Sequence, residues 1–119
     1  MIVDDNAGLA FIIQLILEAD GYQVVTARDG REGYLTYLLF RPDLVIADIQ
    51  MPEMNGVQMM RLIRMHDSNV RTIYISGELD RFRSLLEEEK TRYEVVLLKK
   101  PFTKAELMKS VSMPHHKHY

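Results

Sequence analysis

The sequence predicts an α/β protein built on an open, doubly wound parallel sheet. Short apolar segments of strand length alternate with segments of helical spacing along the whole chain, and such alternation is typical of right-handed strand–helix–strand crossovers. Residues 43–48 are almost continuously apolar, as in a strand whose two faces are both covered. Charged and polar side chains follow several of the predicted strands, which places them at one edge of such a sheet.

The N-terminal elements are a short strand and an amphipathic helix. Only residues 1–3 precede an acidic pair, whereas strands commonly run about 5–6 residues. The first strand therefore looks truncated, and we expect modest stability. Apolar residues then recur at helical spacing from Leu9 to Leu17, and Gly21 supplies a C-terminal stop.

The remaining elements continue the alternation. Residues 22–27 are rich in β-branched side chains and predict a strand, and the helical spacing of residues 29–40 is interrupted at Pro42. Beyond the strand at 43–48, the same reasoning predicts helices over about 56–66, 80–91 and 103–111, and strands over 71–76 and 93–98.

Size and composition limit the function classes. With 119 residues, of which 47% are hydrophobic, the chain fits one domain, which we place at residues 1–112. The formal net charge of −2 and the absence of a Lys/Arg run argue against direct binding of nucleic acid or an anionic membrane. The chain has no cysteine and no apolar run near the roughly 18 residues of a membrane span. We therefore expect a soluble, cytoplasmic protein.

The tail at 113–119 contains three closely spaced histidines, His115, His116 and His118. Such spacing can bind a metal, but on a terminal tail it more often reflects a tag or chance. We expect this tail to be disordered or to be an added sequence.

Polar residues end the predicted strands in a pattern that indicates chemistry. Asp4 and Asp5 follow the first strand, Asp48 the third, Ser76 the fourth and Lys100 the fifth. In a parallel sheet these positions meet at one edge. Two unit charges about 4 Å apart repel by roughly 4 kcal/mol at an effective dielectric of 20, so three carboxylates there require a counter-charge.

A hard divalent cation such as Mg²⁺ suits this set, because Mg²⁺ prefers oxygen ligands and accepts a phosphate oxygen as well. Asp48 is then placed to attack a phosphoryl group, while Lys100 and Ser76 bind phosphoryl oxygens from the other side. The carbonyl of Gln50 is a further candidate ligand, aimed by a turn that Pro52 and Gly56 fix.

Four motifs carry a resemblance to a known family. They are VDDN (3–6), DIQMPEMNG (48–56), ISG (75–77) and KPF (100–102). In their order and spacing the chain resembles the receiver domain of two-component response regulators, the CheY-like fold. The resemblance covers essentially the whole chain.

The resemblance implies a five-stranded sheet in the order 2-1-3-4-5, a flavodoxin-like three-layer sandwich. It implies that Asp48 accepts a phosphoryl group from a histidine kinase or phosphotransfer protein. Mg²⁺ would be held by Asp5, Asp48 and the Gln50 carbonyl, with Asp4 acting mainly through water. Ser76 and Lys100 would contact the phosphoryl group. Such a domain is a switch that assists its own phosphotransfer and dephosphorylation, and not a turnover enzyme.

The resemblance also implies an output surface on the fourth helix, fifth strand and fifth helix, around residues 80–91, 94–99 and 103–111. An output domain or a partner would bind there, and the surface is compatible with homodimerisation. The aromatic residue that many receivers carry three positions before the lysine is Leu97 here. Gln50 and Glu78 occupy positions that tune hydrolysis in the family.

Two alternatives to the receiver hypothesis differ in chemistry. A receiver-like interaction module that does not signal through phosphate is suggested by Leu97 and the short first strand. A metal-dependent phosphatase or phosphotransferase would need an acid–base carboxylate two residues past its nucleophile, where this chain has Gln50.

Several residues also have ordinary structural interpretations. Asp4 and Asp5 could belong to a helix N-cap, and Ser76 could be a turn residue. Of the two adjacent lysines, Lys99 and Lys100, only one can face the site. Met59, Met60 and Met65 are expected in the core, and EEEK (87–90) is expected to be a solvated helix end.

Overall fold

The computed structural model describes residues 1–113 and contains the predicted sheet. Five parallel strands are ordered β2-β1-β3-β4-β5, which confirms the doubly wound fold class and the 2-1-3-4-5 order. The strands are β1 (Ile2–Val3), β2 (Thr26–Ala27), β3 (Leu44–Asp48), β4 (Arg71–Ser76) and β5 (Val95–Lys99). The helices are α1 (Ala7–Ala19), α2 (Gly30–Phe40), α3 (Gly56–Arg64), α4 (Arg83–Arg92) and α5 (Lys104–Val111), and a 3₁₀ turn η1 (Leu79–Phe82) precedes α4.

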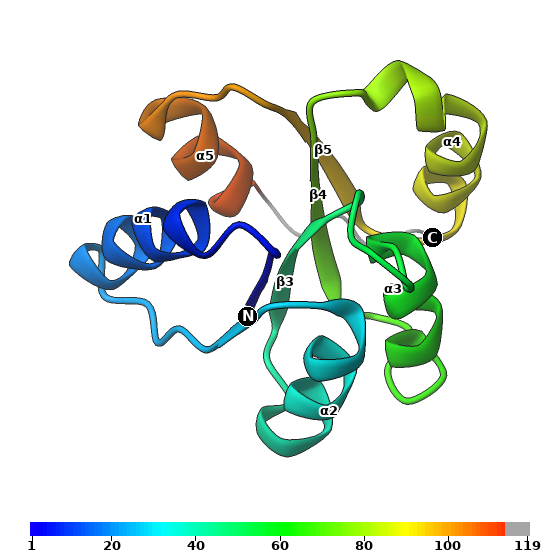
Figure 1. Cartoon of the computed structure of the whole chain (residues 1–119), viewed down its shortest axis with the longest axis horizontal. Coiled ribbons are helices and arrows are strands. Elements are labelled where there is room, and N and C mark those ends of the chain that lie inside the picture. Colours follow the sequence, from blue (N-terminus) through cyan, green and yellow to red (C-terminus); the bar gives the residue numbers. More distant parts are fainter. Residues whose placement is uncertain (114–119) are drawn as a thin grey trace.

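The helices cover both faces of the sheet, α1 and α5 on one side and α2, α3 and α4 on the other (Figure 1). Successive side chains of β3 alternate between these two layers. Ile46 belongs to the apolar cluster under α1 and α5, whereas Val45 and Ala47 belong to the cluster under α2, α3 and α4. This alternation explains why the strand is apolar at nearly every position.

The strand predicted at 22–27 is shorter in the structure, where β2 is only Thr26–Ala27. The reason lies in its neighbour. β1 pairs through Ile2 and Val3 alone, opposite Thr26 and Ala27, and Ile2 donates to the carbonyl of Val25 at 2.9 Å. Residues 22–24 therefore have the composition of a strand but no ladder to join.

The helix predicted at 80–91 is divided in the structure into η1 and α4. Neither element has a side-chain cap at its start, and an exposed ion pair between Arg83 and Asp80 spans their junction. By contrast, α3 begins with a full capping box between Asn55 and Gln58. The start of α4 is thus held more weakly than that of α3.

One prediction about α3 is wrong, and one about α4 is wrong at a single residue. Met65 was expected in the core with Met59 and Met60, but it lies at the end of α3 with 80% of its surface exposed. EEEK was expected to be solvated, and Glu87, Glu88 and Lys90 are exposed, but Glu89 is buried. Its carboxylate forms an ion pair with the buried Arg64, at 2.5 Å.

Glu89 is buried because it completes a polar cluster between α3, α4 and β4. Arg64 donates to Glu89 and, at 2.8 Å, to the hydroxyl of Thr72, and its guanidinium lies 4.0 Å from the centre of the Tyr93 ring. Tyr74 donates to Glu89 at 2.8 Å. We call these five residues the Arg64 cluster.

Residues 1–113 contain no helix that combines the length and the apolar character needed to cross a membrane. The three histidines of the tail lie at 115, 116 and 118, outside the described residues.

Candidate functional site

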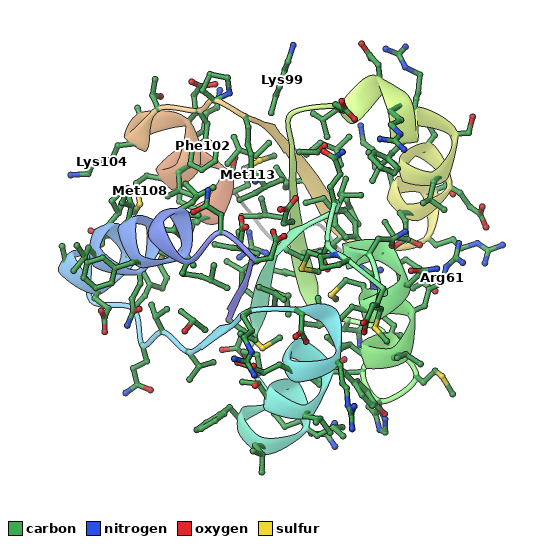
Figure 2. The ribbon with its side chains drawn as sticks, viewed as in Figure 1. Arg61, Lys99, Phe102, Lys104, Met108 and Met113 are labelled. Carbon is green, nitrogen blue, oxygen red and sulfur yellow. The ribbon has the colours of Figure 1, made fainter. Side chains whose placement is uncertain are left out.

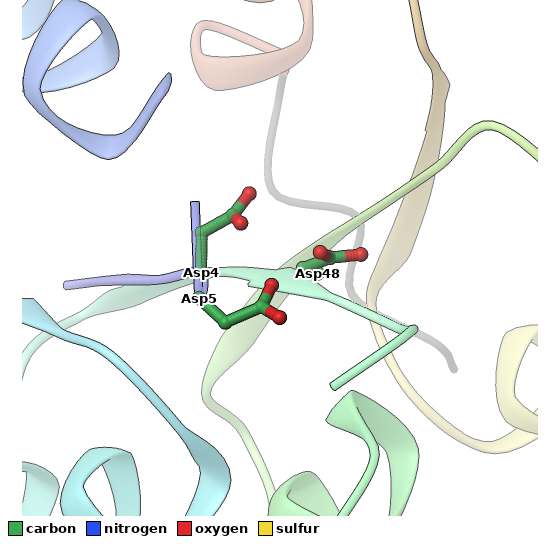
Figure 3. A group of neighbouring side chains, drawn as sticks. All are labelled: Asp4, Asp5 and Asp48. Carbon is green, nitrogen blue, oxygen red and sulfur yellow. The ribbon is translucent and has the colours of Figure 1, made fainter. Parts of the chain in front are cut away.

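Three carboxylates meet at the carboxyl ends of β1 and β3. Asp4 and Asp5 leave the end of β1, and Asp48 is the last residue of β3 (Figure 3). Each offers a carboxylate oxygen that lies within 4.8 Å of those of the other two. The sheet order brings them together, because β1 and β3 are hydrogen-bonded neighbours. We call these three residues and Lys100 the acidic edge.

The loop after β3 depends on Gly56, because any other residue at this position would force the neighbouring backbone to move. A Cβ on Gly56 would lie 2.4 Å from the carbonyl oxygen of Asp48, far inside van der Waals contact. The amide of Gly56 donates to the carbonyl of Ile49 at 3.0 Å, and the amide of Gln50 donates to Asp48 Oδ1 at 3.1 Å. The loop thus closes tightly behind Asp48 and orients its carboxylate.

Asp48 is electrostatically strained at the acidic edge. Its pKa is raised from 3.8 to about 6, first by burial and then by the charge of Asp4, against the opposing effects of Lys100 and the Gln50 amide. Asp4 is buried as well, whereas Asp5 is exposed. The site therefore joins two carboxylates that have lost most of their water to a third that faces solvent.

Lys100 supplies the cation within reach of these acids. Its Nζ lies 3.3 Å from Asp48 Oδ2 and 3.4 Å from Asp4 Oδ2. Lys99, the alternative lysine, is exposed and points away from the body of the molecule (Figure 2). The backbone holds Lys100 in place, since its amide donates to the carbonyl of Ser76 at 2.9 Å. The Lys100–Pro101 peptide bond is cis.

Ser76 ends β4 next to this group and takes part in a hydrogen-bond chain. Its Oγ accepts from the amide of Glu78 at 2.9 Å and donates to Gln50 Oε1 at 3.3 Å. Gln50 Nε2 in turn donates to Glu78 at 3.0 Å. The chain continues to Arg81, which donates to the same carboxylate oxygen of Glu78 at 3.1 Å.

The sequence analysis named every residue of this hydrogen-bond chain except Arg81. Arg81 lies three residues after Glu78, and this spacing across a turn could have indicated their contact. Leu97, which replaces the family's aromatic residue, is half-buried and packs against the apolar cluster under α2, α3 and α4.

The donor set fits a hard divalent cation. Its side-chain ligand atoms are all carboxylate oxygens, and their combined charge of three exceeds that of the one nearby ammonium. The raised pKa of Asp48 shows the cost of ionising this carboxyl in the protein alone, a cost set first by burial and then by the charge of Asp4. Mg²⁺ would relieve it, and neither thiolate nor imidazole belongs to the described group.

Comparison with known proteins identifies the family. The family model described as the response regulator receiver domain matches residues 1–112. The sporulation initiation phosphotransferase F of Bacillus subtilis is 30% identical over 113 residues, covering 93% of this chain and 88% of that protein. Against a curated DNA-binding response regulator that it matches at 31% identity, the chain spans 48% of the length.

Solved structures agree with this relationship. Chemotaxis protein CheY4 of Vibrio cholerae superimposes with a TM-score of 0.83 at 28% identity, covering 92% of each chain. A chain of the CheX–CheY–BeF₃–Mg²⁺ complex of Borrelia burgdorferi gives 0.81 at 29% identity, covering 92% of this chain and 83% of that one. The protein is thus a phosphoryl-accepting switch of two-component signalling, and its chain belongs to the response regulator receiver domain family.

Proposed function

We propose that Asp48 is the phosphoacceptor and that the acidic edge captures the phosphoryl group with Mg²⁺. Asp5, Asp48 and the Gln50 carbonyl would hold the ion, and Asp4 would act mainly through water. The single observation that carries this proposal is the meeting of three carboxylates with Lys100 at the strand ends. Bound there, Mg²⁺ would neutralise charge on the incoming phosphoryl group.

In the proposed reaction an oxygen of the Asp48 carboxylate attacks phosphorus and the bond from phosphorus to the leaving group breaks. With acetyl phosphate the leaving group is acetate. The donor in a two-component system is a phosphohistidine of a histidine kinase or phosphotransfer protein. Lys100 Nζ would bind a phosphoryl oxygen, which requires it to release part of its contact with Asp48.

The ionisation of Asp48 limits this step at low pH. A protonated carboxyl is a poor nucleophile and a poor ligand, and the pKa of Asp48 in the protein alone is raised to about 6. Mg²⁺ and protons therefore compete for the site, so that the metal-free protein needs a pH above this value to be ready for the reaction.

Two surfaces flank this site and differ in character. Helix α1 exposes Phe11, Ile12 and Leu15, each by more than half, and residues 7–17 carry no charge. Since α1 starts directly after Asp4 and Asp5, we place the phosphodonor protein against this apolar side. The face of α4, β5 and α5 exposes many charged side chains, Lys99 and Lys104 among them (Figure 2), and we assign it to the output partner.

Because the chain spans about half of several DNA-binding relatives, an attached output domain is one such partner. A second copy of the chain is another. A cytoplasmic location and assistance by the domain in its own dephosphorylation complete the proposal.

The test is phosphorylation by a small donor. The protein is incubated with acetyl phosphate and Mg²⁺, and intact-mass spectrometry is used to detect one added phosphoryl group. We expect one addition in the native sequence, none after removal of Mg²⁺ with a chelator, and none in Asp48→Asn. Glu18→Gln, which removes an exposed carboxylate from the far end of α1, should behave like the native protein.

No addition under conditions that label an ordinary receiver would indicate an interaction module instead. Continuous turnover of acetyl phosphate without a stable adduct would indicate a phosphatase.

A further inference from the structure

The hydroxyl of Ser76 has a single proton, and that proton is already engaged. Ser76 is fully buried at the end of β4. Its Oγ accepts the amide proton of Glu78 and donates its own proton to Gln50 Oε1. Because a serine hydroxyl is a donor only once, it cannot donate to Gln50 and to a phosphoryl oxygen at the same time.

The amide of Gln50 is held in the orientation that receives this proton. Its Nε2 donates to Glu78 Oε2 at 3.0 Å, which directs Oε1 toward Ser76. A carboxylate only accepts hydrogen bonds when ionised, so Glu78 selects the amino end of the amide. Arg81 donates to the same oxygen of Glu78, which links the arrangement to η1 and the start of α4.

We propose that Gln50 is a positioning residue that latches Ser76 in its unphosphorylated orientation. The inference rests on the proposed function. Capture of a phosphoryl oxygen by Ser76 breaks the bond to Gln50, and the freed amide no longer fixes Glu78 and Arg81. The latch thereby opposes phosphoryl binding and couples it to the weakly capped start of α4.

The size of the effect follows from the exposure of the latch. The bond from Ser76 to Gln50 is long, at 3.3 Å, and Gln50 is exposed to solvent. A neutral hydrogen bond of this kind contributes about 0.5–1 kcal/mol net, which corresponds to a change of roughly two- to fivefold in a binding constant. The latch is therefore weak enough for a phosphoryl group to open.

The experiment measures binding of beryllofluoride, a phosphoryl mimic, to the whole chain with Mg²⁺ by titration calorimetry. We expect Gln50→Ala to tighten binding about two- to fivefold. Gln50→Leu, which keeps the bulk of the side chain, should do the same and guards against a folding defect. The backbone carbonyl of residue 50, the candidate metal ligand, is present in both variants.

A double-mutant cycle separates a latch from a merely structural effect. In a Ser76→Ala background there is no hydroxyl to hold, so Gln50→Ala should leave beryllofluoride affinity unchanged. Glu78→Ala should tighten binding less than Gln50→Ala does, because it only releases the amide. Gln23→Ala, at an exposed glutamine outside the site, is the matched control and should have no effect.

Unchanged or weaker binding in both Gln50 variants would overturn the latch. A gain of equal size in the Ser76→Ala background would overturn it too. If the native protein neither binds beryllofluoride nor takes up a phosphoryl group from acetyl phosphate, the proposed function fails, and the latch falls with it.

Discussion

The acidic edge and the Arg64 cluster are two groups of largely buried polar residues that differ in charge balance. The acidic edge sets three carboxylates against one ammonium, at 3.3 Å from Asp48 and 3.4 Å from Asp4. The Arg64 cluster sets one guanidinium against one carboxylate at 2.5 Å and adds the hydroxyls of Tyr74 and Thr72. The acidic edge includes the last residue of β3, and the Arg64 cluster includes two residues of the neighbouring β4. Only the acidic edge carries more negative than positive charge.

This difference separates a ligand site from a structural one. In the Arg64 cluster each charge has a partner of opposite sign, so no ion or substrate is needed to make it stable. At the acidic edge the pKa of Asp48 is raised, which means that the folded protein holds this carboxylate at a cost. Unbalanced charge at the carboxyl ends of the strands indicates a site that binds a ligand.

The largest expected effect comes from breaking the balanced cluster. Glu89→Ala leaves the guanidinium of Arg64 buried without its carboxylate, and we expect a loss of about 3–5 kcal/mol in the free energy of unfolding. Urea denaturation followed by circular dichroism measures it. Glu87→Ala, at an exposed position of the same helix, should stay within about 0.5 kcal/mol of the native protein. Equal losses in the two variants would show that the cluster contributes nothing special.

Removing a charge from the acidic edge should raise the free energy of unfolding, whereas Glu89→Ala should lower it. The rise in the pKa of Asp48 to about 6 corresponds to about 3 kcal/mol of unfavourable free energy in the folded state at neutral pH. Since Asp48→Asn also takes a partner from Lys100, we expect it to stabilise the protein by about 1–2 kcal/mol at pH 7 without Mg²⁺.

The pH dependence of this gain has a definite direction. A raised pKa means that the folded state binds a proton more tightly than the unfolded state. Asp48 therefore stabilises the protein most below pH 3.8 and loses that contribution as pH rises through about 6. The advantage of Asp48→Asn should be full at pH 7 and vanish near pH 4. A gain that does not change between these pH values would contradict the electrostatic explanation.

Mg²⁺ should stabilise the acidic edge and leave the Arg64 cluster unaffected. At a concentration ten times the dissociation constant, a ligand bound only by the folded state adds about 1.4 kcal/mol. We expect Mg²⁺ to raise the melting temperature of the native protein and of Glu87→Ala, but not that of Asp48→Asn. A rise of equal size in Asp48→Asn would place the ion elsewhere.

The smallest expected effect is kinetic. Glu78 lies next to Ser76 and half of its side chain is exposed, where it can compete for or repel the attacking water. We expect Glu78→Ala to change the lifetime of the phosphoryl group on the protein without abolishing its formation. Intact-mass measurements after removal of the donor give the decay rate. If formation and lifetime fell together, Glu78 would have a role in capture instead.

Local sequence pattern was sufficient where the physical cause is local or periodic. The apolar run of β3 and the turn fixed by Gly56 predicted a strand that ends in Asp48. β2 could not be predicted in the same way, because residues 22–24 lack a partner strand in β1, and pairing is a property of two segments.

The buried ion pair shows a signal that was present but overlooked. Arg64 lies four residues after Met60 and seven after Val57, and Glu89 lies three after Leu86, so both occupy the buried stripe of their helices. Charge alone suggested solvent for Glu89, while helical spacing indicated burial. Position on the stripe was the better guide, although the pairing of these two residues depends on how α3 and α4 meet.

The most direct test of the central claim is to locate the phosphoryl group. Reduction of an acyl phosphate with borohydride converts the aspartyl residue to homoserine, which peptide mass spectrometry can place in the sequence. After incubation with acetyl phosphate and Mg²⁺, we predict homoserine at position 48 alone. Homoserine at position 4 or 5, or at no position while an intact-mass adduct is present, would contradict the account.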